Sequence, residues 1–561
     1  MFVHFPRQFC INGSGGRSYG YHYSKFNYFL NVLRFTNKIR CSSTISINGN
    51  SGTPTPLFRN KWEAVIGLEI HAQIKSKTKL FSSSSTSFNK PVNTNVSVID
   101  AAFPGTIPQL NARCVELAIL TSFALSCNIQ RVSSFDRKHY SYPDLPAGYQ
   151  ITQHFAPLAI NGKISLSSLL DGLEYDKEIR IKQVQLEQDT GKSLYEIGPD
   201  GYPVTLIDLN RAGIGLMEIV TEPDIRSSKE SGLLVRKLQS LLRAVGSSDG
   251  NMEEGSLRCD ANVSVHEPSK PFGTRCEIKN LNSVKFLMSA IDAEIERQVE
   301  LLEQGIPIMQ ETRKFDVPGN KTLRLRAKES LMDYRYMPEA DLPELILSEE
   351  YLSRIYQSLP ELPDSTKFRL TRQYGISAFD AGVVLGEEGG VEYFEKITNN
   401  RNPKLVVNWI THELFGQLKT RNVKFIDNPV TVEQLGSLVD SVNQNIISGT
   451  TGKQVLAFMI DGDTRLANAI IQEKGLQQIN DSVELEKICK RIMAKYPDDI
   501  QRIKKGQLKV FKWFVGQIMR ETKGQANPQL VNETKTDQNL CGIAHLLFGF
   551  ARWQLIMSAL A

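Results

Sequence analysis

Acidic and amide side chains recur inside apolar, strand-like runs between Ile179 and Asn282. The stretch contains the segments IRIKQVQLEQD, NRAGIGLMEIV, NMEEGSLRCDANV and EIKNLNS. A buried charge is costly unless it is paired or binds a cation. So many carboxylates among Val, Ile and Leu therefore favour a polar cavity lined by strands, of the kind that holds a metal ion and a phosphate.

Two segments offer ligands for a divalent cation. Glu69 and His71 are two residues apart in WEAVIGLEIHAQI, so a strand turns both to one face. Glu187 shares a face with Asp189, and Gln188 points the other way if the strand persists. Oxygen and imidazole ligands together suit a divalent metal. For Glu69 and His71, an ordinary place on the outer face of a strand is the alternative.

Glu218 lies inside the apolar run LMEIV, so its charge needs a partner. One alternative is a metal ion, and the other is a buried salt bridge to Arg211 or Arg180. The sequence leaves both open.

Several residues could contact a nucleotide phosphate or its counterion: Lys192, Arg211, Glu254, Arg258, Lys279 and Asn280. Lys279 and Asn280 precede a predicted helix, whose free amides could receive phosphate oxygens. An ordinary helix cap is the alternative there. Gly191-Lys192-Ser193 lacks the earlier glycine of a phosphate loop, so that motif is rejected.

The elements that must position these groups are mostly strands. We expect a strand at Val65–Ile70, a helix at Cys114–Cys127 and a strand-rich region from about Arg131 to Val265. In the strand Leu257–Val265 the polar residues Arg258, Asp260, Asn262 and Ser264 share one face. Ser283–Glu303 is predicted to be an amphipathic helix with Asn282 or Ser283 as cap, Phe286 in its apolar stripe and Gly305 at its end.

Beyond residue 348 the sequence becomes rich in Leu, Glu and Lys with helical periodicity, interrupted by prolines at Pro360–Pro363. A last module from Asp481 carries many Lys and Arg residues between Lys487 and Lys523, with Phe511, Trp513 and Phe514 among them. That composition suits nucleic-acid contact, and a solvated helix face with a small aromatic core is the alternative.

The net charge of +5 is concentrated at the N-terminus, where residues 1–62 contain no Asp or Glu. A basic, hydroxylated and acid-free segment is typical of an organelle transit peptide. A cut near Arg40 would remove six positive charges and leave −1, so nucleic-acid contact must come from local patches. The eight cysteines form no C-x-x-C pair, and no run is long enough to span a bilayer.

Long motifs in the chain resemble the B subunit (GatB) of the glutamyl-tRNA(Gln) amidotransferase. They are WEAVIGLEIHAQI, AFPGTIPQLN, FDRKHYSYPDLPAGYQITQ and QETRKFD…DYRYMPEADLP, and the resemblance extends from about Trp62 to Asn532. The QLEQD and NRAGIGLMEIV variants are similar to the mitochondrial branch, which agrees with import into the mitochondrial matrix; plastid import is the alternative.

The resemblance implies an α+β protein. Its parts would be a transit peptide and linker at 1–58, a glutamine-synthetase-like cradle at 59–348, an all-α domain at 349–479 and a small YqeY-like tail at 480–561, atypical after 532. The cradle would use ATP and Mg²⁺ to phosphorylate the glutamate side chain on Glu-tRNA(Gln). Ammonia from the amidase-type A subunit would then displace phosphate, and a small C subunit would link the two. This makes the chain a carbon–nitrogen ligase with glutamine as amido donor, with no membrane partner.

Carried over by motif, the metal site uses His71, Glu187, Gln188 and Glu218, and the catalytic set is Glu69, His71 and Glu218. Bacterial relatives carry a second glutamate where this chain has Gln188, which removes a ligand charge. They also hold zinc with four cysteines, whose matching positions here are Ser82, Ser84, Ser97 and Asp100, so we expect no zinc. A non-catalytic tRNA-binding or assembly subunit with a degenerate metal site is the main alternative, and a free-standing ligase for a small carboxylate is the third.

Overall fold

A computed structural model represents the 561-residue chain. It describes residues 61–326 and 334–478, and nearer the C-terminus 487–488, 491–492, 494–497 and 508–522. The predicted transit segment and the atypical end after 532 lie outside the described residues. The chain divides into two compact units. The first comprises Met1–Ile164, Ile179–Val235 and Gly246–Ser358, and the second comprises Ser165–Glu178, Arg236–Val245 and Leu359–Ala561.

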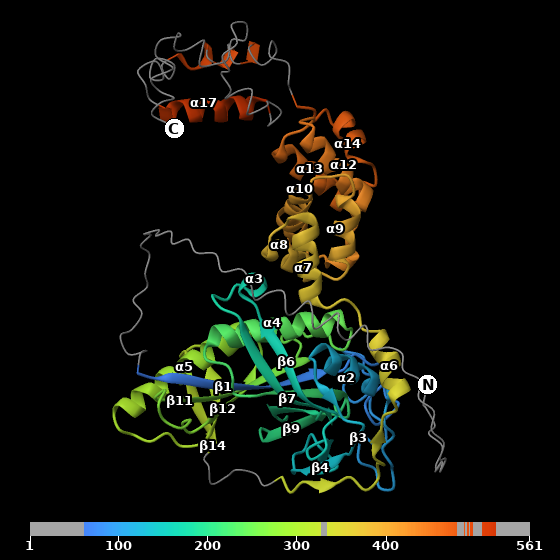
Figure 1. Ribbon diagram of the computed structural model, residues 1–561. Coiled ribbons are helices and arrows are strands. Elements are labelled where there is room, and N and C mark those ends of the chain that lie inside the picture. Colours follow the sequence, from blue (N-terminus) through green and yellow to red (C-terminus); the bar gives the residue numbers. More distant parts are fainter. Residues whose placement is uncertain are drawn as a thin grey trace, which may run out of the picture. The chain divides into compact units, whose positions relative to one another are not determined.

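A nine-stranded sheet forms the centre of the first unit (Figure 1). Its order is β14-β13-β12-β11-β1-β10-β7-β6-β2, and β1 pairs antiparallel with both β10 and β11. The strands are β1 (Glu63–Gln73), β2 (Asn128–Ile129), β6 (Ala159–Leu166), β7 (Lys177–Gln188), β10 (Gly215–Thr221), β11 (Leu257–His266), β12 (Cys276–Leu281), β13 (Thr312–Asp316) and β14 (Lys321–Arg326). The sheet thus brings together strands that lie far apart in the sequence.

Alternating side chains give this sheet one apolar and one polar face. Leu68 and Ile70 of β1 are buried on the apolar face, as are Cys259 and Ala261 of β11. Helix α5 (Val284–Glu303) packs on β11 and β12, and α2 (Ala112–Ala124) approaches β10 so closely that a Cβ on Gly215 would lie 3.2 Å from a cysteine sulfur. The helices therefore cover the apolar face and leave the polar face for chemistry.

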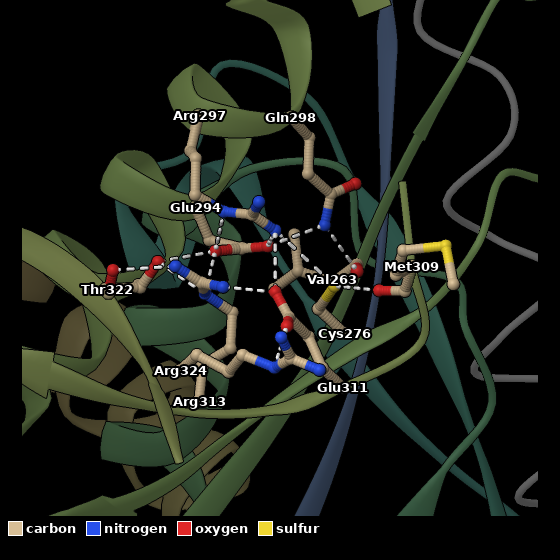
Figure 2. Close-up of polar contacts among 10 residues, drawn as sticks. All are labelled: Val263, Cys276, Glu294, Arg297, Gln298, Met309, Glu311, Arg313, Thr322 and Arg324. Atoms are coloured by element: carbon tan, nitrogen blue, oxygen red, sulfur yellow. Dashed lines mark hydrogen bonds and ion pairs between the residues drawn. The ribbon is translucent and has the colours of Figure 1, made fainter. Parts of the chain in front are cut away.

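Helix α4 (Ser228–Ala244) packs against α5 at Gly232. A Cβ at this glycine would lie 2.5 Å from Met288 Sδ, so the close approach of the two helices requires glycine. At the far edge of the sheet, Glu294 of α5 binds Arg313 of β13 and Thr322 of β14, and these contacts tie the edge strands to the helix (Figure 2).

Three small sheets complete the strands of the first unit. One has the order β15-β4-β5, the second pairs β16 with β3, and the third is the hairpin β8-β9. Their bounds, with those of helix α6, are β3 (Val132–Ser133), β4 (Asp136–His139), β5 (Tyr149–Thr152), β8 (Lys192–Ile197), β9 (Pro203–Asp208), β15 (Met337–Pro338), β16 (Leu345–Ile346) and α6 (Glu349–Gln357).

The second unit is helical. Its core contains Phe394, Ile410, Leu438 and Val455, all fully buried. The helices are α3 (Ser168–Asp171), α7 (Pro363–Tyr374), α8 (Ala378–Leu385), α9 (Gly390–Thr398), α10 (Pro403–Asn408), the π-helix η3 (Trp409–Leu414), α11 (Phe415–Thr420), the 3₁₀ helix η4 (Phe425–Asp427), α12 (Val432–Asn443), α13 (Gly449–Ile460), α14 (Ala467–Glu473) and α17 (Leu508–Glu521). Within the described part of the chain, no helix is long and apolar enough to cross a membrane.

Most of the predicted architecture is confirmed. The sheet-rich region precedes helices, β11 has the predicted alternation, Ser283 caps α5, and the prolines separate α6 from α7. The region from Arg131 to Val265 is strand-rich as predicted, but it also contains the 17-residue α4, which was missed. Two expectations were wrong. Phe286 is 36% exposed because the buried stripe of α5 runs through Leu287 and Ile291. Lys279 and Asn280 belong to β12, so they do not open the helix, which begins at Val284.

Candidate active site

Strand register gathers the polar residues of four strands on one face of the sheet. His71 of β1 lies opposite Glu218 of β10 and opposite Arg258 of β11. Glu218 lies in turn opposite Gln185 of β7. Because paired residues in antiparallel strands point to the same side, all four side chains face away from the helix-covered side. Glu69 and Asp260, two residue pairs further along β1 and β11, share this face.

Glu187, two residues from Gln185 on β7, shares this face, and three of its side chains converge. Ligand atoms of His71, Glu187 and Glu218 all lie within 4.8 Å of one another, and His71 Nε2 is 3.9 Å from Glu218 Oε2. Gln185 Nε2 donates to Glu218 Oε2 at 2.8 Å, and the amide of Gln150 on β5 donates to Glu187. The polar neighbours hold both carboxylates in place, and the Glu218 oxygen that accepts from Gln185 is also the one near the imidazole.

Burial determines the protonation of this cluster. It lowers the pKa of His71 below 6.5, so the imidazole is neutral at pH 7 and can donate a lone pair. It raises the pKa values of Glu187 and Glu218 above 4.5, and the charge of Glu69 raises that of Glu218 further. One buried oxygen of Glu187, Oε2, has no hydrogen-bond partner among the described residues. Two buried carboxylates, an unsatisfied oxygen and a neutral imidazole fit a divalent cation with oxygen and nitrogen ligands.

Lys138 of β4 supplies a cation beside this cluster. Its Nζ lies 3.9 Å from Glu187 Oε2, and the charge of Glu187 holds the pKa of Lys138 well above its usual range. Lys138 therefore stays protonated and can neutralise an anion that approaches the carboxylates. The sequence did not single out this residue, because it comes from a different sheet and from a segment used only for the resemblance.

A second cation, Arg258, adjoins His71 across the β1–β11 pair. Its Nη2 lies 2.8 Å from Asp189 Oδ2, and Asp189 also receives Gln73 Nε2 at 3.0 Å. Although burial alone would raise the pKa of Asp189, Arg258 and Arg211 lower it, so this carboxylate stays ionised. The Nε of Arg258 is buried without a hydrogen-bond partner among the residues described. Asp189 thus holds the guanidinium of Arg258 in place, and the Nε–H of Arg258 remains available as a hydrogen-bond donor.

Comparisons with known proteins identify the family of the chain. A family described as the GatB/GatE catalytic domain matches residues 64–353, and a second, described as the GatB domain, matches residues 392–536. The chain is 47% identical over 483 residues to the B subunit of the aspartyl/glutamyl-tRNA(Asn/Gln) amidotransferase of Wolbachia pipientis wMel, which covers 86% of this chain and 99% of the relative. It is 46% identical over 492 residues to the protein of the same name from Rickettsia felis, covering 88% and 99%.

This chain belongs to the family of amidotransferase B subunits. The predicted family is therefore confirmed, and so is a sheet-rich part followed by helical domains. The name of the relatives places the chain among the components of a tRNA amidotransferase that has several subunits.

In this B subunit the structure corrects one expected ligand. Gln188 lies opposite Gly215 in the register of β7 and β10, on the face that carries Leu186 and Met217. Strand β7 persists through Gln188, so strict alternation turns its amide away from His71. The unusual residue of the QLEQD segment is thus outside the cluster, and Glu187 occupies the position that faces the imidazole.

Of the two alternatives left open for Glu218, the salt bridge to Arg211 or Arg180 is not formed. Arg180 pairs with Asp224 at 2.7 Å, and Arg211 donates to the carbonyl oxygens of Thr190 and Gly191 at 2.9 and 2.6 Å. Neither arginine forms the buried salt bridge considered for Glu218. Arg211 supports the turn after β7 and lies 3.6 Å from Asp189, so it adjoins the site without facing the cluster.

The predicted phosphate contacts divide into two groups. Lys279 lies on the polar face, with Nζ 3.2 Å from Asp260 and 2.8 Å from Glu277, and the backbone amide of Asn280 donates to Asp260 at 3.1 Å. Lys192 is exposed in the β8-β9 hairpin, outside the large sheet. Glu254 is exposed in the turn before β11. Lys279 therefore shares the sheet face that carries the cluster, as Arg258 does, whereas Lys192 and Glu254 do not.

The loop with Ser82, Ser84, Ser97 and Asp100, where the resemblance predicts no zinc, contains a buried ion pair. Lys79 is fully buried, and its Nζ lies 3.0 Å from Asp100 Oδ2. Asp100 also receives Ser82 Oγ and the backbone amide of Ser97. Ser84 contributes its backbone amide to Ser82. Hydrogen bonds and one ion pair connect this loop, and the absence of zinc stays a prediction.

Proposed function

We propose that this chain is the component of a mitochondrial Glu-tRNA(Gln) amidotransferase that activates the glutamate side chain. The observation that carries the proposal is the convergence of His71, Glu187 and Glu218 on a polar sheet face, between the cations Lys138 and Arg258. Relatives of nearly full length are named as amidotransferases for aspartyl- and glutamyl-tRNA. The acid-free N-terminal segment supports import into mitochondria.

The reaction has two group transfers. An oxygen of the glutamate side chain attacks the γ-phosphorus of ATP, so that an acyl phosphate forms and ADP leaves. Ammonia then attacks the acyl carbon, inorganic phosphate leaves with the C–O bond electrons, and the nitrogen gives up one proton to form the amide. A carboxylate is a poor acyl electrophile, and phosphorylation supplies the leaving group that the second step needs.

A magnesium ion fits the donor set of His71, Glu187 and Glu218, because burial keeps the imidazole neutral and leaves a carboxylate oxygen unsatisfied. Glu69, which accepts from Asn262 Nδ2 at 3.0 Å on the same face, lies beside this set. When bound, the metal supplies charge neutralisation between ATP and the substrate carboxylate. Zinc is not part of the proposal.

The chain's own residues orient and neutralise the reactants. Lys138 and Arg258 place two fixed positive charges on either side of the cluster, where the transferred phosphoryl group carries negative charge. Asp189 positions Arg258, and Asp260 with Glu277 positions Lys279. Phosphoryl transfer needs little more from a protein than such positioning.

Partners follow from the same proposal. Ammonia must come from an amidase-type A subunit, and a small C subunit would join the two in a heterotrimer. The basic module after Asp481 would grip tRNA; of its aromatic residues, Trp513 on α17 is 40% exposed and contacts Tyr496 edge-to-face. The non-catalytic alternative rested on the ligand charge that is missing at Gln188. Because the register of β7 turns Gln188 away from the cluster, we favour a catalytic role.

The test is ATP cleavage by the purified complex with magnesium and Glu-tRNA(Gln), with hydroxylamine added to trap the acyl phosphate as a hydroxamate. We expect ADP and hydroxamate in the wild type, and neither above background in His71→Ala or Glu218→Gln. Glu178→Gln, an exposed glutamate on β7, is the matched control and should behave as wild type. Full activity in the His71 and Glu218 variants would refute the placement of the site.

A further inference from the structure

Six aromatic rings form a row that comes from the segments after β4 and β5 and from the segment before β15. The row, called here the aromatic row, runs through Tyr142, Tyr140, Tyr334, Tyr336, His154 and Phe155. Successive ring centroids are 5.4, 6.2, 6.2, 3.8 and 4.9 Å apart. The closest pair, His154 and Tyr336, is stacked with an interplanar angle of 8°.

Both ends of the aromatic row are accessible. Phe155 is 66% exposed and Tyr142 is 36% exposed, and His154 is also exposed. Single exposed rings are common on protein surfaces, whereas a contiguous group of them is typical of an interaction site. Positive charge accompanies the rings: Lys138 Nζ lies 5.2 Å from the centroid of Tyr334, and the exposed Arg335 separates the last two tyrosines. Rings with cations between them suit a ligand that has both flat π-faces and negative charge.

The backbone between the two tyrosines is held in a demanding conformation. Arg335 has φ +42°, which is in the left-handed region that a non-glycine residue seldom adopts. Such a conformation is unfavourable and persists only when neighbouring contacts enforce it. Here the amide of His139 donates to Tyr334 O at 2.8 Å, and His139 Nδ1 lies 2.9 Å from Arg335 O. His139 of β4 therefore fixes the backbone that carries Tyr334 and Tyr336.

The aromatic row adjoins the candidate active site through one residue. Lys138 contacts Tyr334 on one side and lies 3.9 Å from Glu187 on the other. If the proposed function holds, on which this inference rests, the reacting glutamate is esterified to the last nucleotide of a tRNA. That nucleotide and those before it must then lie immediately outside the cluster, beside the middle of the row at Tyr334.

We propose that the aromatic row binds the unpaired nucleotides at the end of the tRNA by stacking of their bases. A row of several rings is longer than one base, so it suits consecutive nucleotides better than the single adenine of ATP. Only unpaired bases offer free faces to protein rings, so a duplex is a poor ligand. Phosphates between the bases would meet Lys138 and Arg335, which gives charge complementarity.

The test measures binding without ATP, magnesium or turnover. The probe is a short single-stranded RNA that ends in 2-aminopurine, and the comparison is a blunt hairpin in which the same nucleotides are paired. We expect the complex to quench the fluorescence of the single strand, and to bind it in a salt-dependent manner and more tightly than the blunt hairpin. Loss of one stacking ring should weaken binding about 5- to 100-fold, so Phe155→Ala and Tyr336→Ala should each show this loss.

Two variants serve as controls. Phe155→Trp keeps a stacking face and should retain binding, and Tyr195→Ala removes an 80% exposed tyrosine from the β8-β9 hairpin and should have no effect. Equal binding of the blunt hairpin, an unaffected Phe155→Ala, or displacement of the RNA by ATP alone would overturn the proposal. If Phe155→Ala prevented assembly of the complex while the chain still bound the RNA as the wild type does, the aromatic row would instead contact a protein partner, and the proposal would be overturned. A complex that binds and quenches the RNA but never forms hydroxamate would refute the proposed function alone.

Discussion

Replacement of Glu294 by Gln is expected to release the edge strands of the large sheet. Glu294 is fully buried, and its carboxylate accepts from Arg297 Nε at 2.9 Å, Gln298 Nε2 at 2.8 Å and Thr322 Oγ1 at 2.6 Å (Figure 2). Arg313 Nε of β13 lies 3.1 Å away. One carboxylate on α5 therefore holds groups from β13, β14 and its own helix.

The magnitude follows from what the substitution leaves behind. Arg313 is only 7% exposed, and Arg297 is partly buried, so both guanidinium groups would lose a buried counter-charge. Removal of one partner of a buried ion pair costs about 3–5 kcal/mol, because the remaining charge stays desolvated. Glu311 also pairs with Arg313, so we expect the lower part of this range.

Hydrogen exchange measured by mass spectrometry is the appropriate assay, since a chain with two units need not unfold in one step. A loss of about 3 kcal/mol corresponds to a roughly 100-fold drop in protection, localised to β13, β14 and the second half of α5. Glu303→Gln is the matched control: it lies on the same helix, and its side chain is 37% exposed beside Lys61. Equal protection in the two variants would refute the reasoning.

The same residue gives a pH dependence. Burial alone would raise the pKa of Glu294, but hydrogen bonds from Arg297 and Thr322 bring it below 4.5. A folded-state pKa below the unfolded value contributes stability that is complete above pH 4.5 and is lost as the pH falls through the folded value. Protection of β13 and β14 should therefore fall below pH 4.5 in the wild type, and fall less steeply in Glu294→Gln.

Three further predictions concern the first unit. Asp100→Asn should destabilise this unit by about 3 kcal/mol, because Lys79 would remain buried without its counter-charge. Ser82→Ala removes only a hydrogen bond to Asp100 and should cost about 1 kcal/mol. Differential scanning calorimetry would compare the two variants, and equal losses of stability would contradict the account. The affinity of the cluster for a divalent metal should rise with pH from 4.5 upward, because the pKa values of Glu187 and Glu218 are raised and protons compete with the ion. Titration calorimetry in two buffers should detect the protons released on binding. A metal affinity that does not change with pH would count against this ligand set. Asp189→Asn should lower kcat for ATP cleavage about 10- to 100-fold, because Arg258 loses the carboxylate that holds its guanidinium in place. Metal affinity should change little, because the cluster stays intact. An unchanged kcat would show that Asp189 does not position Arg258 for the reaction.

Much of the fold could be predicted because local patterns dominate it. The alternation of β11 and the cap and length of α5 follow from residues close in sequence. Helix α4 was missed although Leu234, Leu238 and Leu241 follow helical spacing, because it lies between strands and was assigned with them. Lys279 was misplaced for another reason: its segment joins β12 through long-range pairing, which overrides the local likeness to a helix start.

The candidate site could be predicted only in part. Alternation identified Glu69 with His71, and Glu187 with Asp189, as pairs on single faces. It could not reveal that Glu187 and Glu218 meet His71, because this depends on the order of strands in the sheet. Lys138 and Gln150 were not singled out, since they reach the cluster from a separate small sheet.

The most direct test of the central claim is the binding of Mn²⁺, as a spectroscopic substitute for Mg²⁺, measured by electron paramagnetic resonance of the purified complex at neutral pH. The account predicts one site whose affinity falls at least about tenfold in Glu187→Gln and in His71→Ala. Glu178→Gln, on the same strand as Glu187 but exposed, should bind as the wild type does. Unchanged Mn²⁺ binding in Glu187→Gln and His71→Ala would contradict the claim that these residues form the metal centre.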